Sequence, residues 1–552
     1  MQRGIDITLQ ILAETPNEAA AGVLVHALDS PHATIQEGTL RALLHRRSPA
    51  GLKAVVARWH SFSKPAKDVI AEYPGRLSGA ARDAVLSDDL QMCANACDAA
   101  RFASEYDLIP ALINVAESDG AEQAEMAAQT LVDLSQLLYD ELSQPQEWRK
   151  RRDPHLFRAN VVSSLELSAR RYPQHGRTEI LMAFLILCGR DNSALKSILR
   201  DPLDRTHSTI VELLTHSSRT AIVELVLSFL DDARAPLAAV NILAQRDDDE
   251  FIGFLLKKIG YEPSSSARVN LKRVKKIRWL QQDVERLAAL DGEGQHAAAQ
   301  IALFSDLKHT EKISVFKELI HHGRPPGRRA AVEALTEFQG VEANRLIIKA
   351  LKDSDVQVQA SALKQLRSRG LPGAMSTLID AIDSPHEVLR RVGRECLNEF
   401  TFSRYLSAYE GMSDDVRIST GRLVAKVDPK TAEMLRAEMN AAARSRRLRA
   451  IEMALCLDMV AEMESAFHEL LDDDDHMVRM EAAWALAECP TEKTRAALRQ
   501  ASLDPSAAVQ SAAQRALEEM VASRPRRKDE INLSAVSLPP AGSASAPEAW
   551  SW

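Results

Sequence analysis

A repeat of about 31 residues constrains this chain more than any other feature. The phrase LLDDDDHMVRMEAAWAL, residues 470–486, is followed by SLDPSAAVQSAAQRAL, residues 502–517. Val478, Ala482 and Leu486 recur as apolar residues 31 positions later. Apolar residues at i, i+4 and i+8 form one face of a helix, and the Asp-rich segment before them predicts a turn that starts that helix.

The last apolar residue of this helix marks the repeat through the C-terminal half. The spacings between successive markers are 32, 31, 31, 27, 31, 31 and 31 residues, and the markers are Leu303, Leu335, Leu366, Leu397, Val424, Leu455, Leu486 and Leu517. The short step lacks about one helical turn and predicts a shortened helix near residues 402–410. Residues 27–43 repeat the wording of residues 381–397, so a period held throughout predicts about 16 repeats.

Each repeat is predicted to be a pair of antiparallel helices. Residues 353–355 form a turn whose oxygens can cap the second helix, which then carries Val358, Ala362 and Leu366. Alanine at the centre of the buried face allows neighbouring helices to approach closely. Because only 5% of residues are aromatic while 45% are hydrophobic, the composition also favours helices. The predicted fold class is all-α, an α-solenoid (superhelix) of helix pairs.

The repeat divides the chain into four predicted segments. Residues 1–139 and 205–522 hold repeats, whereas residues 140–204 form an irregular region of longer helices within the solenoid. Residues 523–552 are rich in Pro, Ser and Ala and have no helical periodicity, which predicts a disordered tail.

The phrase Asp, Val-Arg, Ala, Leu resembles a HEAT repeat, of the short bacterial type found also in bilin-lyase-like proteins. The resemblance is strong over residues 303–520, fair over 20–131 and 205–300, and poor over 140–200. It implies an armadillo-like solenoid whose second helices line a concave face that holds partner proteins.

Basic residues supply the candidate partner-binding positions. Arg390, Arg417 and Arg479 begin second helices and are interpreted as structural, bonding to turn carboxylates. Other arginines could stack into a basic stripe on the concave face, or belong to a solvated face neutralised by nearby Asp and Glu. The predicted partner-binding arginines are Arg391, Arg394, Arg422, Arg446 and Arg449.

Aromatic residues give further candidates. Trp550 and Trp552 end the predicted tail and are a second predicted partner-binding site, with chance as the alternative. The segments 148–153 and 267–280 are basic, and the latter is predicted to be an amphipathic helix. Trp148 and Trp279 beside them could stack on bases or pack under long basic side chains.

We predict no catalytic, cofactor or metal site. The acidic runs 247–249 and 472–475 lack the ligand spacing of a calcium loop. His-Glu pairs occur at 386–387 and 468–469, positions that do not match the second-helix pairs of deoxyhypusine hydroxylase, a HEAT-repeat enzyme. Six scattered cysteines, an N-terminus without a continuous apolar stretch and the absence of an apolar run of membrane length predict a cytoplasmic protein.

The predicted function is a non-catalytic scaffold or adaptor that binds one or more proteins. A net charge of −8 is too mild to indicate general nucleic-acid or membrane binding. Nucleic-acid binding through local basic surfaces is one alternative. A lyase of the bilin-lyase-like HEAT class is the other.

Overall fold

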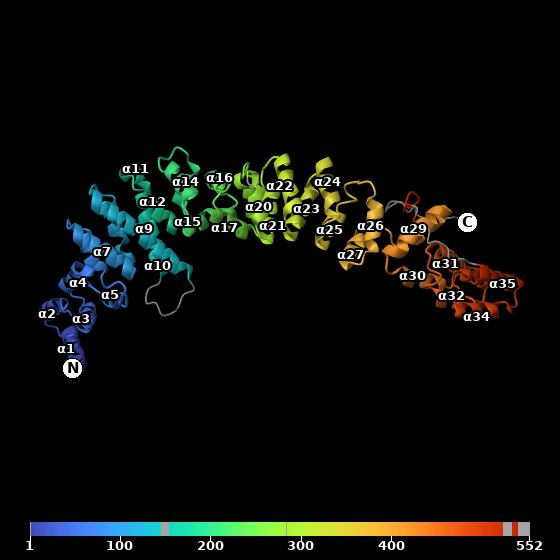
Figure 1. Cartoon of the computed structure of the whole chain (residues 1–552), viewed down its shortest axis with the longest axis horizontal. Helices are drawn as coiled ribbons and strands as arrows, with labels where there is room; N and C mark the ends of the chain where they lie inside the picture. The colour runs from blue at the N-terminus through green and yellow to red at the C-terminus, as the bar shows by residue number, and fades with distance from the viewer. Residues whose placement is uncertain (1, 145–153, 283, 523–530, 532, 539–552) are drawn as a thin grey trace, which may run out of the picture. The chain divides into compact units, whose positions relative to one another are not determined.

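The computed structural model describes residues 2–144, 154–282, 284–522, 531 and 533–538. Within them the chain consists of 35 α-helices and six short 3₁₀ segments, without a β-strand (Figure 1). It divides into two compact units, unit 1 (Met1–Gly327) and unit 2 (Arg328–Trp552). Helix follows helix in each unit, which confirms the predicted all-α solenoid class.

Unit 1 contains the helices up to α22, and α23 crosses its boundary with unit 2. The helices are α1 (Gln2–Glu14), α2 (Ala19–Ala27), α3 (Ala33–Arg46), α4 (Pro49–Ala57), α5 (Lys64–Ala71), α6 (Ser78–Val85), α7 (Leu90–Ala103), α8 (Ile109–Ala116), α9 (Ala121–Ser143), α10 (Pro154–Arg170), α11 (Tyr172–His175), α12 (Thr178–Leu187), α13 (Ser193–Arg200), α14 (His207–His216), α15 (Thr220–Ser228), α16 (Leu237–Gln245), α17 (Asp249–Ile259), α18 (Ser265–Leu271), α19 (Arg278–Gln282), α20 (Val284–Ala289), α21 (Gly292–Phe304), α22 (His309–His322) and α23 (Pro325–Ala334). The 3₁₀ segments are η1 (Trp59–Ser61), η2 (Tyr106–Leu108) and η3 (Phe229–Asp231).

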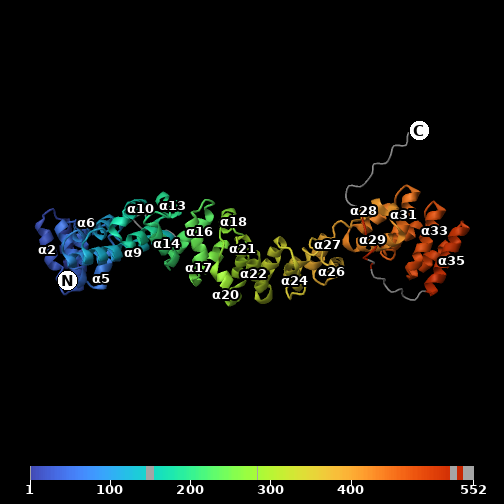
Figure 2. The same cartoon turned by 90° about the horizontal axis from the view of Figure 1, so that it is seen from above.

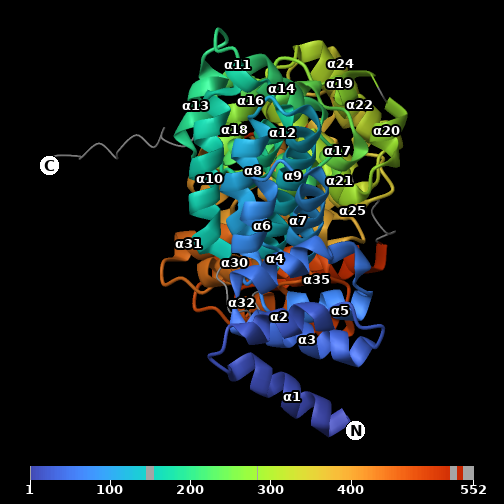
Figure 3. The ribbon, with the colours of Figure 1, turned by 90° about the vertical axis from the view of Figure 1, so that its left-hand side faces the viewer.

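Helices of unit 1 pack mainly on near neighbours in the chain. Figure 3 shows this at the N-terminal end, where α1 lies at the edge and α2 and α3 follow. The long helix α10, of 17 residues, lies in the predicted irregular region, whereas the longer α9, of 23 residues, lies mostly before it. The predicted amphipathic helix over residues 267–280 is wrong, because α18 ends at Leu271 and α19 begins only at Arg278.

Unit 2 is a series of helix pairs. They are α24 (Val341–Ala350) with α25 (Val356–Leu363), α26 (Ala374–Ile382) with α27 (Glu387–Cys396), α28 (Phe402–Ala408) with α29 (Asp414–Val427), α30 (Thr431–Met439) with α31 (Arg444–Cys456), α32 (Glu464–Leu470) with α33 (His476–Ala485), and α34 (Glu492–Ala501) with α35 (Ala507–Ala522). The 3₁₀ segments are η4 (Leu335–Glu337), η5 (Tyr409–Gly411) and η6 (Leu486–Glu488). The seven residues of α28 confirm the predicted short first helix.

The second helices of these pairs form a row, which we call the second-helix row. In it α25 packs on α27, and α29, α31, α33 and α35 pack in succession (Figure 2). Among the described residues α27 and α29 make no comparable contact, and α29 instead meets α26. The row is therefore interrupted between α27 and α29.

Each second helix starts from a capped turn. Asp355 accepts hydrogen bonds from the backbone N–H groups of Gln357 (2.8 Å) and Val358 (3.2 Å), as predicted for a capping residue. The Arg or Gln near the start of the helix donates to a backbone carbonyl of the same turn. This contact is made by Gln359, Arg390, Arg447, Arg479 and Gln510.

Some of these arginines also reach the turn of the next repeat. Arg479 binds both carboxylate oxygens of Asp504 at 2.8 and 3.1 Å, so the turn carboxylate to which it bonds belongs to the next repeat. The same two-bond pairing joins Arg328 to Asp353, and Arg447 reaches Asp473 through one hydrogen bond of 3.0 Å and an ion-pair contact of 2.8 Å. These inter-repeat ion pairs confirm a structural role for Arg479.

The third residue after this Arg or Gln, and after Arg328 of α23 and Arg417 of α29, occupies a small-residue position that is buried in α23 and in every helix of the row. It holds Ala331, Ala362, Gly393, Thr420, Ala450, Ala482 and Ala513. A Cβ on Gly393 would lie 3.0 Å from the carbonyl oxygen of Leu378, which shows how closely the helices approach there. Thr420 is the one residue of the set with a polar side chain.

Residues 533–538 depart from the predicted disorder of residues 523–552. Within unit 2 they form a turn followed by a non-helical stretch beside α29, where the backbone of Ser537 bonds to Thr420 (Figure 1). The prediction of disorder used the composition of the whole tail and did not consider the local apolar pattern Leu-Ser-Ala-Val-Ser-Leu of residues 533–538. Trp550 and Trp552 lie outside the described residues.

The six cysteines form no disulfide, and Cys93, Cys97, Cys188 and Cys489 are buried. This agrees with thiols packed as small apolar groups. In the described part of the chain, no helix combines the length and apolar character needed to cross a bilayer.

Candidate functional site

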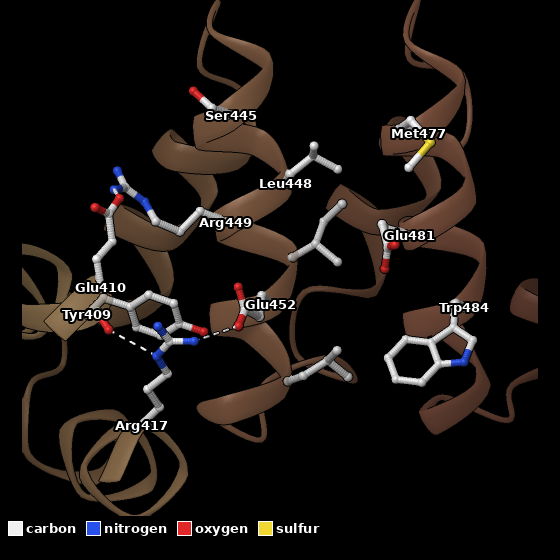
Figure 4. Close-up of a pocket in the computed structure, with 12 residues that line it drawn as sticks. Tyr409, Glu410, Arg417, Ser445, Leu448, Arg449, Glu452, Met477, Glu481 and Trp484 are labelled. Atoms are coloured by element: carbon white, nitrogen blue, oxygen red, sulfur yellow. Dashed lines mark hydrogen bonds and ion pairs between the residues drawn. The ribbon is translucent and has the colours of Figure 1, made fainter. Parts of the chain in front are cut away.

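A pocket of about 620 Å³ opens on the second-helix row of unit 2. Its walls come from η5, α29, α31 and α33 (Figure 4). The lining residues are Tyr409, Glu410, Arg417, Ser445, Leu448, Arg449, Ile451, Glu452, Leu455, Met477, Glu481 and Trp484. The pocket is the candidate site because it joins three consecutive repeats and combines apolar with charged side chains.

Arg417 organises one wall of the pocket. Its guanidinium carbon lies 4.5 Å from the centroid of the Tyr409 ring, and its Nε donates to the Tyr409 carbonyl at 3.0 Å. A second nitrogen donates to Glu452 at 3.0 Å, across to α31. Tyr409 is buried, and burial raises the pKa of its phenol. These contacts hold Arg417 in place, so it shapes the wall and has little freedom to bind a ligand.

The opposite wall of the pocket presents an exposed aromatic ring and a carboxylate. Trp484 is 50% exposed although it is one of the largest apolar side chains in the unit. Glu481 lies one helical turn before it on α33, is half-buried, and has no hydrogen-bond or ion-pair partner among the described residues. Figure 4 shows both side chains facing Leu448 and Glu452 of α31 across the pocket. An exposed indole beside a free carboxylate is suited to a cationic side chain.

Sequence reasoning missed Trp484, although a signal exists. Trp484 lies two residues after the small-residue position of its repeat. In the other repeats the residue at this place is charged. These residues are Glu333, Lys364, Glu395, Arg422, Glu452 and Arg515. Tryptophan at a position that is otherwise charged and solvent-facing indicates an exposed aromatic residue, which marks an interaction surface better than charge does.

The structure separates the five predicted partner-binding arginines. Arg449 lines the pocket and pairs with Glu410 at 3.0 Å. Arg446 instead binds both oxygens of Glu438 at 2.8 and 2.6 Å, and these bonds lower the pKa of Glu438. Arg391 lies 3.8 Å from Glu395 of its own helix. Arg394 is exposed, and Arg422 is half-buried.

These contacts bear on the predicted basic stripe. Arg391, Arg446 and Arg449 each have a carboxylate neighbour, as the alternative of a neutralised face expected. Partner binding by the five arginines remains a prediction. Of them, Arg449 alone is among the residues that line the pocket.

A second pocket, of about 560 Å³, lies in unit 1 between α16 and the segment that joins α18 to α19. Arg273, Lys275, Lys276 and Arg278 line it together with Asn241 and Gln245. Lys275 and Lys276 have no ion-pair partner in the described part of the chain. The break in the predicted helix thus gathers the basic residues around one concavity.

The two predicted aromatic contacts with nucleic acid have different outcomes. Trp279 is 1% exposed and therefore packed in the core, which agrees with the packing interpretation and excludes stacking on a base in this conformation. Trp148 and the basic run at 148–153 lie outside the described residues.

Metal-ligating side chains do not cluster in the part of the chain that the structure describes. No group of three or more His, Cys, Asp or Glu residues is arranged to hold a metal ion among those residues. His386 is the residue that precedes α27, and His468 lies in the first helix α32.

Three comparisons place the chain among known proteins. A family model described as HEAT repeats matches residues 313–398 and 411–518. A search of curated proteins finds no match.

Among solved structures, one reported for the interaction between cadherin and beta-catenin is 14% identical, with a TM-score of 0.36 over 91% of this chain and 99% of the other. A structure of importin beta is 11% identical, with a TM-score of 0.25 over 93% and 88%. These low TM-scores add nothing to the family match. By this match and by their paired helices, residues 313–398 and 411–518 consist of HEAT repeats.

Proposed function

We propose that this chain is a non-catalytic scaffold that binds partner proteins on its second-helix row, which in HEAT solenoids lines the concave face. The pocket between α29, α31 and α33 is the contact we propose, and the exposed Trp484 is the observation that carries it. Interfaces draw most of their binding free energy from a few residues, among which Trp, Tyr and Arg are enriched.

The charges of the pocket indicate the chemistry of the partner. Arg417 and Arg449 are already paired with Glu452 and Glu410, whereas Glu481 has no partner among the described residues. A lysine or arginine side chain of the partner would satisfy Glu481 and lie against the Trp484 ring. Apolar residues next to that lysine or arginine would pack against Leu448 and Met477. The pocket therefore favours a basic segment with adjacent apolar residues, whereas the predicted arginine stripe favours an acidic one.

A peptide-display selection on the full-length protein separates these two proposals. We expect enrichment of peptides that place Lys or Arg beside an apolar residue, and loss of their binding in Trp484→Ala and Glu481→Lys variants. Leu503→Ala is the matched control, because Leu503 is 82% exposed and does not line the pocket. Enrichment of acidic peptides, lost instead on replacing Arg391, Arg394 and Arg422, would favour the stripe. Binding that no variant alters would contradict both.

Affinity capture from lysate of the source organism extends the test to whole proteins. Specific proteins should be retained after nuclease treatment by the wild type and by Leu503→Ala, and lost with Trp484→Ala. Capture that requires nucleic acid would contradict the scaffold.

The basic pocket of unit 1 supports a second candidate function, binding of a nucleic-acid backbone. Lys275 and Lys276 face no counter-ion among the described residues, and each phosphate contact releases counterions. Lys275→Gln with Lys276→Gln should then weaken binding of a labelled oligonucleotide and reduce its salt dependence. Absence of any binding at low salt would exclude this function.

A further inference from the structure

We propose that the break in the second-helix row between α27 and α29 is a peptide-docking site, and that its occupant is the chain's own segment Leu533–Leu538. This site is separate from the pocket, which lies along α29, α31 and α33. The segment is 117 residues from its contact on α29 and belongs to the same unit. It would act as an internal ligand that occupies the site until another peptide displaces it.

The first evidence is the bonding between Thr420 and Ser537. The backbone N–H of Ser537 donates to Thr420 Oγ1 at 3.2 Å, and the Thr420 hydroxyl donates to the Ser537 carbonyl at 3.3 Å. Thr420 is fully buried, so its hydroxyl could not be satisfied by bulk water. One side chain thus satisfies both backbone groups of one tail residue.

The second evidence is the position of Thr420 in the repeat. The equivalent positions hold Ala331, Ala362, Gly393, Ala450, Ala482 and Ala513, all of them buried and without a polar side-chain atom. A buried hydroxyl at an alanine position is unfavourable unless it is hydrogen-bonded. In this structure Ser537 supplies those bonds, so the departure from the repeat and the docked segment explain each other.

The third evidence is the interruption itself. Elsewhere in the row, neighbouring second helices pack on one another, whereas α27 and α29 make no comparable contact in the described part of unit 2. Arg447 and Arg479 reach a carboxylate in the following repeat, but Arg390 of α27 bonds to carbonyls of its own turn. The interruption between α27 and α29 thus leaves a side of α29 to which a peptide can bind.

The contacts also indicate what kind of peptide fits. Recognition of Ser537 runs through its backbone, and the residue itself is exposed. Ala535, Val536 and Leu538 are half-buried. The site therefore suits a short non-helical segment with small and aliphatic side chains around one residue whose N–H and carbonyl are both free.

Hydrogen exchange of the full-length protein tests the docking. Ser537→Pro removes the N–H donor, whereas Ser537→Ala keeps it and is the matched control. Thr420→Val removes the hydroxyl at similar volume, and Thr420→Ser retains it. We expect amides of residues 533–538 to exchange about thirtyfold faster in Thr420→Val, which loses two hydrogen bonds of ordinary net strength, and about fivefold faster in Ser537→Pro, which loses one of them. Exchange at the rate of an unstructured peptide in the wild type would overturn the proposal.

Binding of the segment in trans tests whether the break is a docking site. A labelled peptide of residues 531–540 should bind full-length Ser537→Pro about fivefold more tightly than the wild type, whose own intact segment competes at a high effective concentration. Adding Thr420→Val to Ser537→Pro should abolish that binding. Equal binding by the three proteins, or none by Ser537→Pro with unchanged helicity, would overturn the docking site.

Discussion

Removing Arg479 should loosen the last described repeat of unit 2 without unfolding the others. Arg479 donates to the Asp473 carbonyl at 2.7 Å and binds Asp504 through two nitrogens. It therefore connects the turn before α33 with the turn before α35. In a solenoid, stability is a sum of repeat and nearest-neighbour contributions, so the loss of this connection should act locally.

The size of the effect follows from the exposure of the pair. The side chains of Arg479 and Asp504 are 16% and 10% exposed. Exposed pairs contribute up to about 1 kcal/mol, and breaking a fully buried pair costs about 3–5 kcal/mol. Ser506 still donates to Asp504 at 2.7 Å after the substitution, so we expect Arg479→Gln to cost about 2 kcal/mol. That cost is roughly a thirtyfold increase in the opening equilibrium of the terminal repeat.

Native-state hydrogen exchange measures this opening repeat by repeat. Amides of α34 and α35 should exchange about thirtyfold faster in Arg479→Gln, whereas those of α25 and α27 should keep the wild-type rate. Asp504→Asn should have a similar effect, and the double variant should be less destabilised than the sum of the singles, because the two residues act as one unit.

Two results would refute this reasoning. Unchanged exchange in α35 would mean that the ion pair contributes nothing to the interface. Equal acceleration in every helix of unit 2 would mean that the unit opens as one cooperative body and that nearest-neighbour coupling does not describe it.

Three further predictions concern packing, pH and the arginine stripe. Gly421→Ala should lower the free energy of unfolding by about 1–3 kcal/mol, because the new Cβ would lie 2.9 Å from the Cys456 carbonyl oxygen; Gly253→Ala, with nothing within 4 Å, should raise it by about 0.5–1 kcal/mol in denaturant titrations. Hydrogen bonding to Arg479 lowers the pKa of Asp504, so its stabilisation is present above about pH 4 and is lost as the pH falls through the folded pKa; titrations against Asp504→Asn should show the difference vanish there. Replacing the three stripe arginines Arg391, Arg394 and Arg449 by glutamine should shift the melting temperature by less than about 4 °C, since the pairs of Arg391 and Arg449 are long or largely exposed. Arg446 is kept, because it binds both oxygens of the buried Glu438. A larger shift would assign the three arginines to stability.

Helix pairing could be predicted from the sequence because burial repeats with the helical period. Val358, Ala362 and Leu366 are buried as predicted, and Asp355 caps its helix. The marker residue was less reliable in α31. Counting back from Leu455 places the turn arginine and the small buried residue one position too late, because Arg447 and Ala450 fill these roles. Periodicity reports which face is buried, and it tolerates a shift of one residue within a turn.

Clusters of charged residues in the sequence do not locate the candidate site. Arginines were prominent in the sequence, but ion pairing depends on carboxylates such as Glu410, which lies 39 residues from Arg449 and is brought close only by the fold. The free carboxylate of Glu481 is likewise visible only once the partners of its neighbours are known. Comparison within the repeat would have selected Trp484, because that position is charged in the other repeats.

One irregularity in the repeat accounts for much of what distinguishes unit 2. The four-residue deficit before Val424 shortens α28, and at that repeat the second-helix row is interrupted and the small-residue position becomes Thr420. The docked segment lies on one side of α29, while Arg417, one turn away on the same helix, forms a wall of the pocket. Displacement of Leu533–Leu538 would therefore act on a helix that the partner site also uses. If α29 transmits this change, the affinity of the pocket for its peptide should differ between the wild type and Ser537→Pro, and equal affinities would show that the two sites are independent.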